Sequence, residues 1–137
     1  MKSAQSKPKN SVLVVDDDEF AMEEMIEALS EFGLTVHKAS TGDDALAQAR
    51  RHRPDFVLMD YLLPGTTGLE VAASMRTRWP EIKVIMMSGA ENFCKAATTR
   101  NTGAIAILRK PFPIDQVGEF ICKSIKTQLE EADATDW

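Results

Sequence analysis

The sequence predicts a single α/β domain in which five parallel strands alternate with five helices. Short apolar runs such as Ser11–Val15 alternate with longer segments whose apolar residues recur at helical spacing. Consecutive strands connected by helices are parallel, and right-handed crossovers then place helices on both faces of the sheet. The length of 137 residues fits one such domain.

The first two strand–helix units occupy the N-terminal part of the domain. Ser11–Val15 is a continuous β-branched run, as expected for a strand buried on both faces. Apolar residues at helical spacing over residues 22–29 predict a helix that stops at Gly33. A short strand over residues 34–38 and a helix over residues 41–51, capped by its first Thr, complete the second unit.

The remaining three units have the same form. Strands are expected over residues 55–59, 82–87 and 104–108. Helices are expected over residues 69–78, over 91–100, and after Pro113 to about Leu129. A loop containing Pro64 and Gly65 precedes the first of these helices. Residues 11–129 therefore form the expected domain, between a polar, flexible arm (1–10) and an acidic tail (130–137).

Composition and charge exclude several classes of protein. Hydrophobic residues make up 44% and charged residues 27%, which is typical of a globular domain. The apolar runs are too short for a membrane span, and none follows the basic start as a signal peptide requires. The net charge of −5 argues against direct nucleic-acid binding, and two cysteines are too few for a disulfide scaffold. We therefore expect a soluble, cytoplasmic domain.

Polar side chains lie where four of the five predicted strands end. They are Asp16 and Asp17 after the first strand, Asp60 at the third, Ser88 at the fourth and Lys110 after the fifth. The C-terminal ends of parallel strands meet at one edge of the sheet, where open α/β folds bind their ligands. We therefore expect these carboxylate, hydroxyl and ammonium groups to converge.

Such a cluster restricts the chemistry of the site. Carboxylates a few ångströms apart repel one another, so either one takes up a proton or a cation binds among them. Oxygen ligands without His or Cys favour a hard ion, Mg²⁺ or Mn²⁺, over zinc. Lys110 and Ser88 could contact phosphoryl oxygens. A central carboxylate could then act as a nucleophile and form an aspartyl phosphate.

Four runs of the sequence resemble, in order and spacing, the motifs of bacterial response-regulator receiver domains. They are VLVVDDDEF, PDFVLMDYLLPG, VIMMSGA and ILRKPF, within a resemblance that covers about residues 11–124. The resemblance implies a flavodoxin-like fold with strand order 2-1-3-4-5. It also implies that Asp60 accepts a phosphoryl group from a histidine kinase or a histidine phosphotransfer protein of a two-component or phosphorelay system.

The resemblance further implies a Mg²⁺ site beside the phosphoacceptor. Asp17 corresponds to a direct metal ligand, and Asp16 to an acid that acts largely through water. Asp60 would itself be a ligand, and Leu62 stands where the family contributes a backbone carbonyl. The third acid of the run, Asp18, is expected to cap the first helix, because Asp is a favoured residue at a helix N-terminus.

Other family positions concern the response to phosphorylation. Ser88 corresponds to the switch hydroxyl, and Lys110 to the phosphate-contacting lysine, whose bond to Pro111 is usually cis. Ile107 stands where the family often has Tyr or Phe, so the usual rotation of an aromatic ring is not expected. Phosphorylation is expected to alter the face formed by the fourth helix, fifth strand and fifth helix for a downstream protein. The domain would be a monomer or a weak, phosphorylation-dependent dimer.

Two other functions fit the same fold less well. A small aspartate-nucleophile phosphatase usually has a second Asp two residues after the nucleophile, where this chain has Leu62. Such an enzyme also needs a substrate cap, for which 137 residues leave no room. A flavin-binding domain needs a phosphate-binding loop after the first strand, where residues 16–18 are acidic and would repel phosphate. The leading hypothesis is a phosphorylation-controlled binding module rather than an enzyme.

Overall fold

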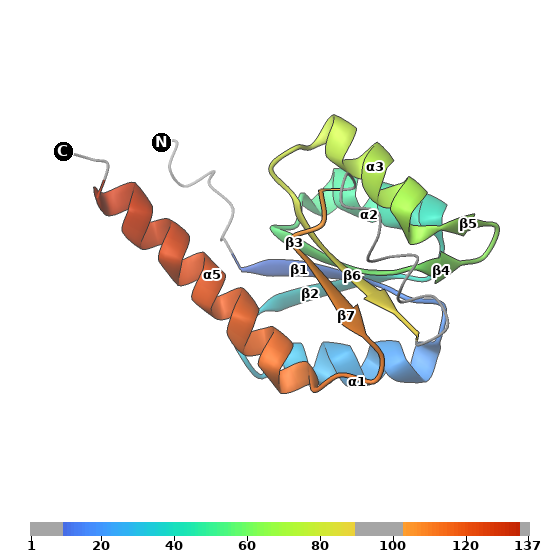
Figure 1. Ribbon diagram of the computed structural model, residues 1–137, viewed down its shortest axis with the longest axis horizontal. Coiled ribbons are helices and arrows are strands. Elements are labelled where there is room, and N and C mark those ends of the chain that lie inside the picture. Colours follow the sequence, from blue (N-terminus) through green and yellow to red (C-terminus); the bar gives the residue numbers. More distant parts are fainter. Residues whose placement is uncertain (1–9, 90–102, 135–137) are drawn as a thin grey trace.

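A five-stranded parallel sheet forms the centre of the fold. The computed structural model describes residues 10–89 and 103–134. The strands of this sheet are, in spatial order, β2 (Thr35–Ala39), β1 (Ser11–Val15), β3 (Phe56–Asp60), β6 (Lys83–Ser88) and β7 (Ala106–Arg109) (Figure 1). Every neighbouring pair is parallel. Counted over these five strands, the order is the expected 2-1-3-4-5.

Helices cover both faces of the sheet, as predicted. On one face lie α1 (Glu19–Ser30) and α5 (Ile114–Ala134), and on the other lie α2 (Gly42–His52) and α3 (Gly68–Arg78) (Figure 1). The helix expected at 91–100 and residues 1–9 of the expected arm lie outside the described residues. Among the helices of the described ranges, none has both the length and the apolar composition needed to span a bilayer.

Helix α5 is longer than the sequence analysis predicted. It continues to Ala134 instead of ending near Leu129, so most of the expected acidic tail is helical. The reason is composition: Glu and Ala are good helix formers, and no Gly or Pro interrupts the segment. Residues 135–137 of the expected tail lie outside the described residues.

Four strands lie one or two residues further along the chain than expected. β3 ends at Asp60, which pairs with Met87, and β6 ends at Ser88, which pairs with Arg109. The predicted ends of these two strands came too early, because the apolar run stops before Asp60 and Ser88 whereas the pairing of the backbone includes them. Asp60 and Ser88 therefore belong to the sheet itself, which holds them more rigidly than a loop would.

The segment between β3 and α3 is a small hairpin instead of the expected loop. β4 (Leu62–Leu63) and β5 (Thr66–Thr67) pair antiparallel around Gly65, whose φ of 76° lies in the left-handed region that favours glycine. Two-residue strands are too short to show an alternating pattern in the sequence. Thr67 then caps α3, because its hydroxyl accepts from the Glu70 amide at 3.3 Å.

Apolar side chains form two core layers, one on each face of the sheet. β1 and β3 are buried along their whole length, as the continuous apolar runs predict. Met75 and Trp79 of the α3 region belong to one layer, and Leu29 and Ile121 belong to the other. Asp18 caps α1 as expected: its Oδ1 accepts from two amides of the first turn at 3.0 and 3.2 Å. The two core layers hold the strands in place, so the residues at the C-terminal ends of the strands have fixed positions relative to one another.

Candidate functional site

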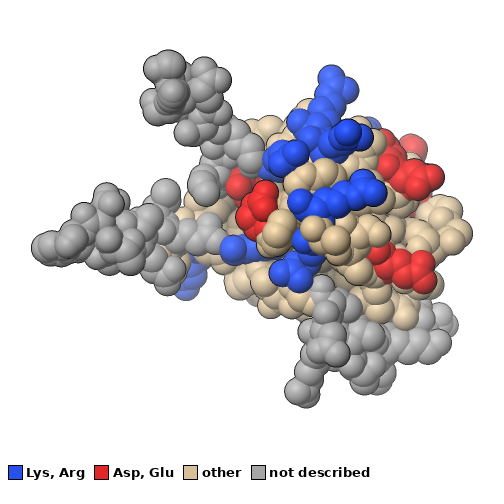
Figure 2. Space-filling model, turned by 90° about the horizontal axis from the view of Figure 1, so that it is seen from above, with Lys and Arg blue, Asp and Glu red and all other residues tan. Residues whose placement is uncertain are grey.

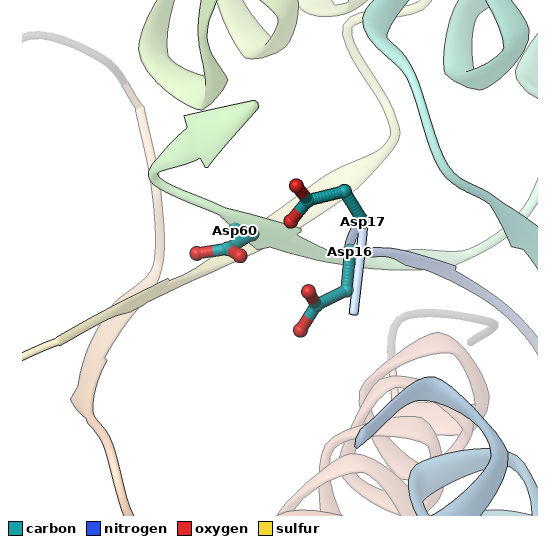
Figure 3. A group of neighbouring side chains, drawn as sticks. All are labelled: Asp16, Asp17 and Asp60. Atoms are coloured by element: carbon teal, nitrogen blue, oxygen red, sulfur yellow. The ribbon is translucent and has the colours of Figure 1, made fainter. Parts of the chain in front are cut away.

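Three carboxylates and one ammonium group meet at the C-terminal edge of the sheet. Asp16 and Asp17 follow β1, Asp60 ends β3 and Lys110 follows β7. The three Asp residues each offer a carboxylate oxygen within 4.8 Å of the others. Figure 3 shows Asp16 and Asp17 extending from the end of β1 beside Asp60. These side chains line an open cavity of about 510 Å³, so a ligand can reach them.

Lys110 joins two of the carboxylates directly. Its Nζ donates to Oδ2 of Asp60 at 3.2 Å and to Oδ2 of Asp16 at 3.3 Å. The other oxygen of Asp16 accepts from the Asp18 amide at 2.9 Å, and Asp16 is completely buried. Both oxygens of Asp16 are therefore engaged within the protein. Asp17, by contrast, is exposed, so a ligand in the cavity meets it more readily than Asp16.

The site carries more negative than positive charge. The pKa of Asp60 is raised to about 6, because burial and the charge of Asp16 raise it more than Lys110 lowers it. Burial lowers the pKa of Lys110, but the charges of Asp60 and Asp16 outweigh burial and raise this pKa above its ordinary value. At neutral pH one ammonium group faces three carboxylates. A bound cation would relieve this imbalance.

The raised pKa of Asp60 predicts how pH affects the metal-free protein. The folded protein holds a proton on Asp60 more tightly than the unfolded chain does, and this stabilises the folded state. The stabilisation is fully present below the ordinary pKa of 3.8 and is lost as pH rises through about 6. For this carboxyl, which is 11% exposed, the change amounts to about 3 kcal/mol in the free energy of unfolding. Asp60→Asn should therefore be more stable than wild type at about pH 8, and the difference should shrink toward about pH 4. Urea unfolding in EDTA measures both curves, and parallel curves would contradict the prediction.

Two predicted site residues lie beside the cluster and, within the described residues, form no hydrogen bond to its carboxylates. Ser88 is fully buried, and its hydroxyl donates to the Gly89 carbonyl at 3.0 Å. Its own carbonyl accepts from the Lys110 amide at 2.7 Å, which fixes the end of β6 against the end of β7. Leu62 lines the cavity and is 53% exposed. The structure therefore gathers the three acids and the lysine, and places Ser88 and Leu62 around them.

Two contacts that position the site were not identified from the sequence. The predicted helix begins only after Gly68, yet a Cβ at Gly68 would overlap the carbonyl oxygen of Asp60. The Gly68 amide also donates to the Tyr61 carbonyl at 2.6 Å, so α3 begins directly against the end of β3. Asp18 was expected only as a helix cap, but its amide also holds Asp16. Neither contact has a signal in the sequence, because Gly and Asp are ordinary residues of turns and caps.

Comparison with known proteins decides which family this site belongs to. The chain matches the family model of the response regulator receiver domain over residues 12–122. The chain belongs to this family. It is similar to the response regulator MprA of Mycobacterium ulcerans (strain Agy99), with 29% identity over 126 residues that make up 91% of the chain and 54% of MprA. It is also similar to the DNA-binding transcriptional regulator NtrC of Salmonella typhimurium, with 32% identity over 120 residues, or 88% of the chain and 26% of NtrC.

Solved structures agree with the family assignment. A response regulator receiver domain protein (CheY-like) from Methanospirillum hungatei JF-1 superposes on this receiver domain with a TM-score of 0.81 and 27% identity. The match covers 90% of this chain and 99% of that one. The bond between Lys110 and Pro111 is cis, as the resemblance to receiver domains implied.

The curated relatives are longer than this chain, so the match concerns only a part of each of them. This receiver domain spans about half the length of MprA and about a quarter of NtrC. These relatives are response regulators, so the phosphatase alternative has no support from them. The receiver domain acts as a phosphoacceptor in two-component signalling.

Proposed function

We propose that this receiver domain accepts the phosphoryl group on Asp60, from the phosphohistidine of a histidine kinase or a histidine phosphotransfer protein. The observation that carries the proposal is the position of Asp60 at the rigid end of β3, 3.2 Å from the Lys110 ammonium. Asp16 and Asp17 are close enough to share a cation with it. No other group of this kind lies within the described ranges of the chain.

The reaction follows from the atoms at this edge. A carboxylate oxygen of Asp60 forms a bond to phosphorus, the phosphorus–nitrogen bond of the donor breaks, and the donor imidazole takes up a proton. Lys110 already contacts the Asp60 carboxylate, so its ammonium can balance charge on the phosphoryl oxygens. Ser88 would donate to a phosphoryl oxygen after giving up its bond to Gly89.

The acidic cluster fits Mg²⁺. It offers oxygen ligands only, and these lie within 4.8 Å of one another, as a hard divalent cation requires. We assign Asp17, Asp60 and the Leu62 carbonyl as direct ligands and Asp16 as an acid that acts through water, because both oxygens of Asp16 are engaged by Lys110 and Asp18. When bound, the ion supplies positive charge that offsets the carboxylates and the incoming phosphoryl group.

Labelling with radioactive acetyl phosphate tests the proposed function. The wild-type protein should take up label in the presence of Mg²⁺ and not in EDTA. The label should survive acid and be released by hydroxylamine, because an acyl phosphate behaves in this way. A label that resists hydroxylamine, or one that forms equally in EDTA, would contradict the proposal.

Asp17→Asn should abolish Mg²⁺-dependent phosphorylation and leave the fold intact. Asp17 is exposed, so the substitution costs little stability, but it removes a charged ligand from the ion. Calorimetric Mg²⁺ titration and acetyl phosphate labelling measure the two effects. Glu81→Gln is a matched control, because Glu81 is exposed beside the opposite end of the sheet, before β6. Normal labelling of Asp17→Asn would show that the ion binds through other residues.

We further propose that phosphorylation alters the face formed by residues 91–100, β7 and α5, and that a downstream protein binds there. Residues 91–100 lie outside the described residues, but β7 is tied to the site by the bond from the Lys110 amide to the Ser88 carbonyl. Ile107 packs partly buried against the core and has no ring to rotate. The change is therefore expected to pass through the backbone, in a monomer or a weak, phosphorylation-dependent dimer. We propose that this domain does not bind nucleic acid directly, because its net charge is −5.

A further inference from the structure

Helix α1 carries an acidic stripe (Glu19, Glu23, Glu27 and Glu31) that its own geometry does not favour. All four side chains are exposed, and residues four apart lie next to one another along a helix. Like charges at this spacing are destabilising, and Glu27 and Glu31 also lie at the negative end of the helix dipole. Within the described residues only Glu23 has a cationic partner, Lys38 at 3.3 Å. The helix dipole favours Glu19 in the first turn and Lys38 pairs with Glu23, but the folded monomer gives no reason for Glu27 and Glu31.

A basic band (Arg50, Arg51, Arg53 and Arg78) lies on the opposite side of the molecule. Figure 2 looks onto the α2–α3 side and shows Lys and Arg side chains gathered in a band across it. The Arg53 guanidinium lies 5.1 Å from the ring centroid of Trp79, the residue that ends α3, so the ends of α2 and α3 are in contact. All four arginines are exposed, and none forms an ion pair in the part of the chain that the structure describes.

The two surfaces are complementary in charge but cannot meet within one molecule. α1 packs on one face of the sheet, whereas α2 and α3 pack on the other. We propose that the basic band of one copy binds the acidic stripe of a second copy. The stripe extends about 18 Å along its helix. The basic band has a comparable width, because it spans two helix ends whose axes are about 8–10 Å apart, together with the arginine side chains on them.

A second copy explains both surfaces, and a polyanion explains only one. Nucleic acid or an anionic membrane would engage the basic band but would leave the acidic stripe without a role. The helix dipole favours arginines at the ends of α2 and α3, but it disfavours Glu27 and Glu31 at the end of α1.

The proposed contact has a definite form. Because the band and the stripe are different surfaces, the association is head to tail, and each added copy presents another free band or stripe. Association should therefore continue beyond the dimer. Because the charges are exposed, the contact should be weak and sensitive to salt. It needs no phosphoryl group and uses other elements than the output face, so it comes in addition to the weak, phosphorylation-dependent dimer proposed above.

Sedimentation velocity of the unphosphorylated protein tests this proposal. At about 0.1 M salt the sedimentation coefficient should rise with protein concentration without a plateau at the dimer, and at about 1 M salt it should stay that of the monomer. Arg51→Glu with Arg78→Glu should weaken the association more than roughly tenfold, and so should Glu27→Lys with Glu31→Lys. Combining the four substitutions should restore it, because opposite charges face each other again and the net charge returns to the wild-type value.

A matched control separates the contact from net charge. Lys123→Glu with Lys126→Glu, both exposed on α5, changes the net charge as much as the band variant does and should associate like wild type. Three results would overturn the proposal: a wild-type monomer at every concentration at about 0.1 M salt, association that the band variant retains, or a natively folded combined variant that fails to associate. Binding of DNA or anionic vesicles without self-association would assign the band to a polyanion instead.

Discussion

Asp60→Asn should reduce phosphorylation by acetyl phosphate to background. An amide oxygen does not attack phosphorus as a carboxylate oxygen does, and the substitution also removes a charged ligand of the ion. The fold should remain, because Asn has nearly the same size and the buried charge that it removes is unfavourable in the metal-free protein. Radiolabelling in the presence of Mg²⁺, with intact-mass measurement of the same samples, gives the result directly.

Asp18→Asn is the appropriate control for this substitution. Asp18 belongs to the same acidic run but is exposed and caps α1, a role that Asn also fills. Its amide, which holds Asp16, is unchanged by the substitution. Labelling should therefore stay close to that of wild type. If Asp60→Asn still acquires a hydroxylamine-labile label, the nucleophile is another residue of the cluster, such as Asp17.

The convergence of Asp16, Asp60 and Lys110 could be predicted because it depends only on topology. In a parallel sheet, residues at the ends of neighbouring strands lie together whatever their side chains are. The orientation of each polar group depends instead on local contacts that no spacing encodes. The Ser88 hydroxyl donates to Gly89, and the Asp18 amide takes one oxygen of Asp16. The residues of the cluster could therefore be predicted from the sequence, but their hydrogen bonds could not.

The errors in the predicted fold have a common origin. Apolar periodicity reports which side chains are buried, whereas strands and helices are defined by backbone hydrogen bonds. The predicted third strand therefore stopped before Asp60, and the hairpin of β4 and β5 was read as a loop. The end of α5 was missed for the same reason, since its last residues are polar and helical. The first two errors matter for the site, because β3 ends at Asp60 and the hairpin follows it directly.

Gly68→Ala should lower the free energy of unfolding by about 1–3 kcal/mol, although Ala is the better helix former. A Cβ at this position would overlap the Asp60 carbonyl oxygen and lie 2.8 Å from Cγ of Met59. Both neighbours belong to a central strand that is buried along its whole length, so they cannot move aside cheaply. α3 must shift instead, and the Gly68 amide then loses its 2.6 Å bond to Tyr61. Urea unfolding measures the loss of stability.

Gly89→Ala provides the comparison, because a Cβ there meets no atom of the described residues within 4 Å and φ is not in the left-handed region. Its stability should stay within about 1 kcal/mol of wild type. If Gly68→Ala proves as stable as Gly89→Ala, then α3 tolerates displacement and does not fix the end of β3. If the loss is found, Gly68→Ala should also slow labelling at Asp60. When α3 shifts, the Gly68 amide no longer holds the Tyr61 carbonyl next to Asp60, and phosphoryl transfer depends on how precisely the residues around the phosphoacceptor are held.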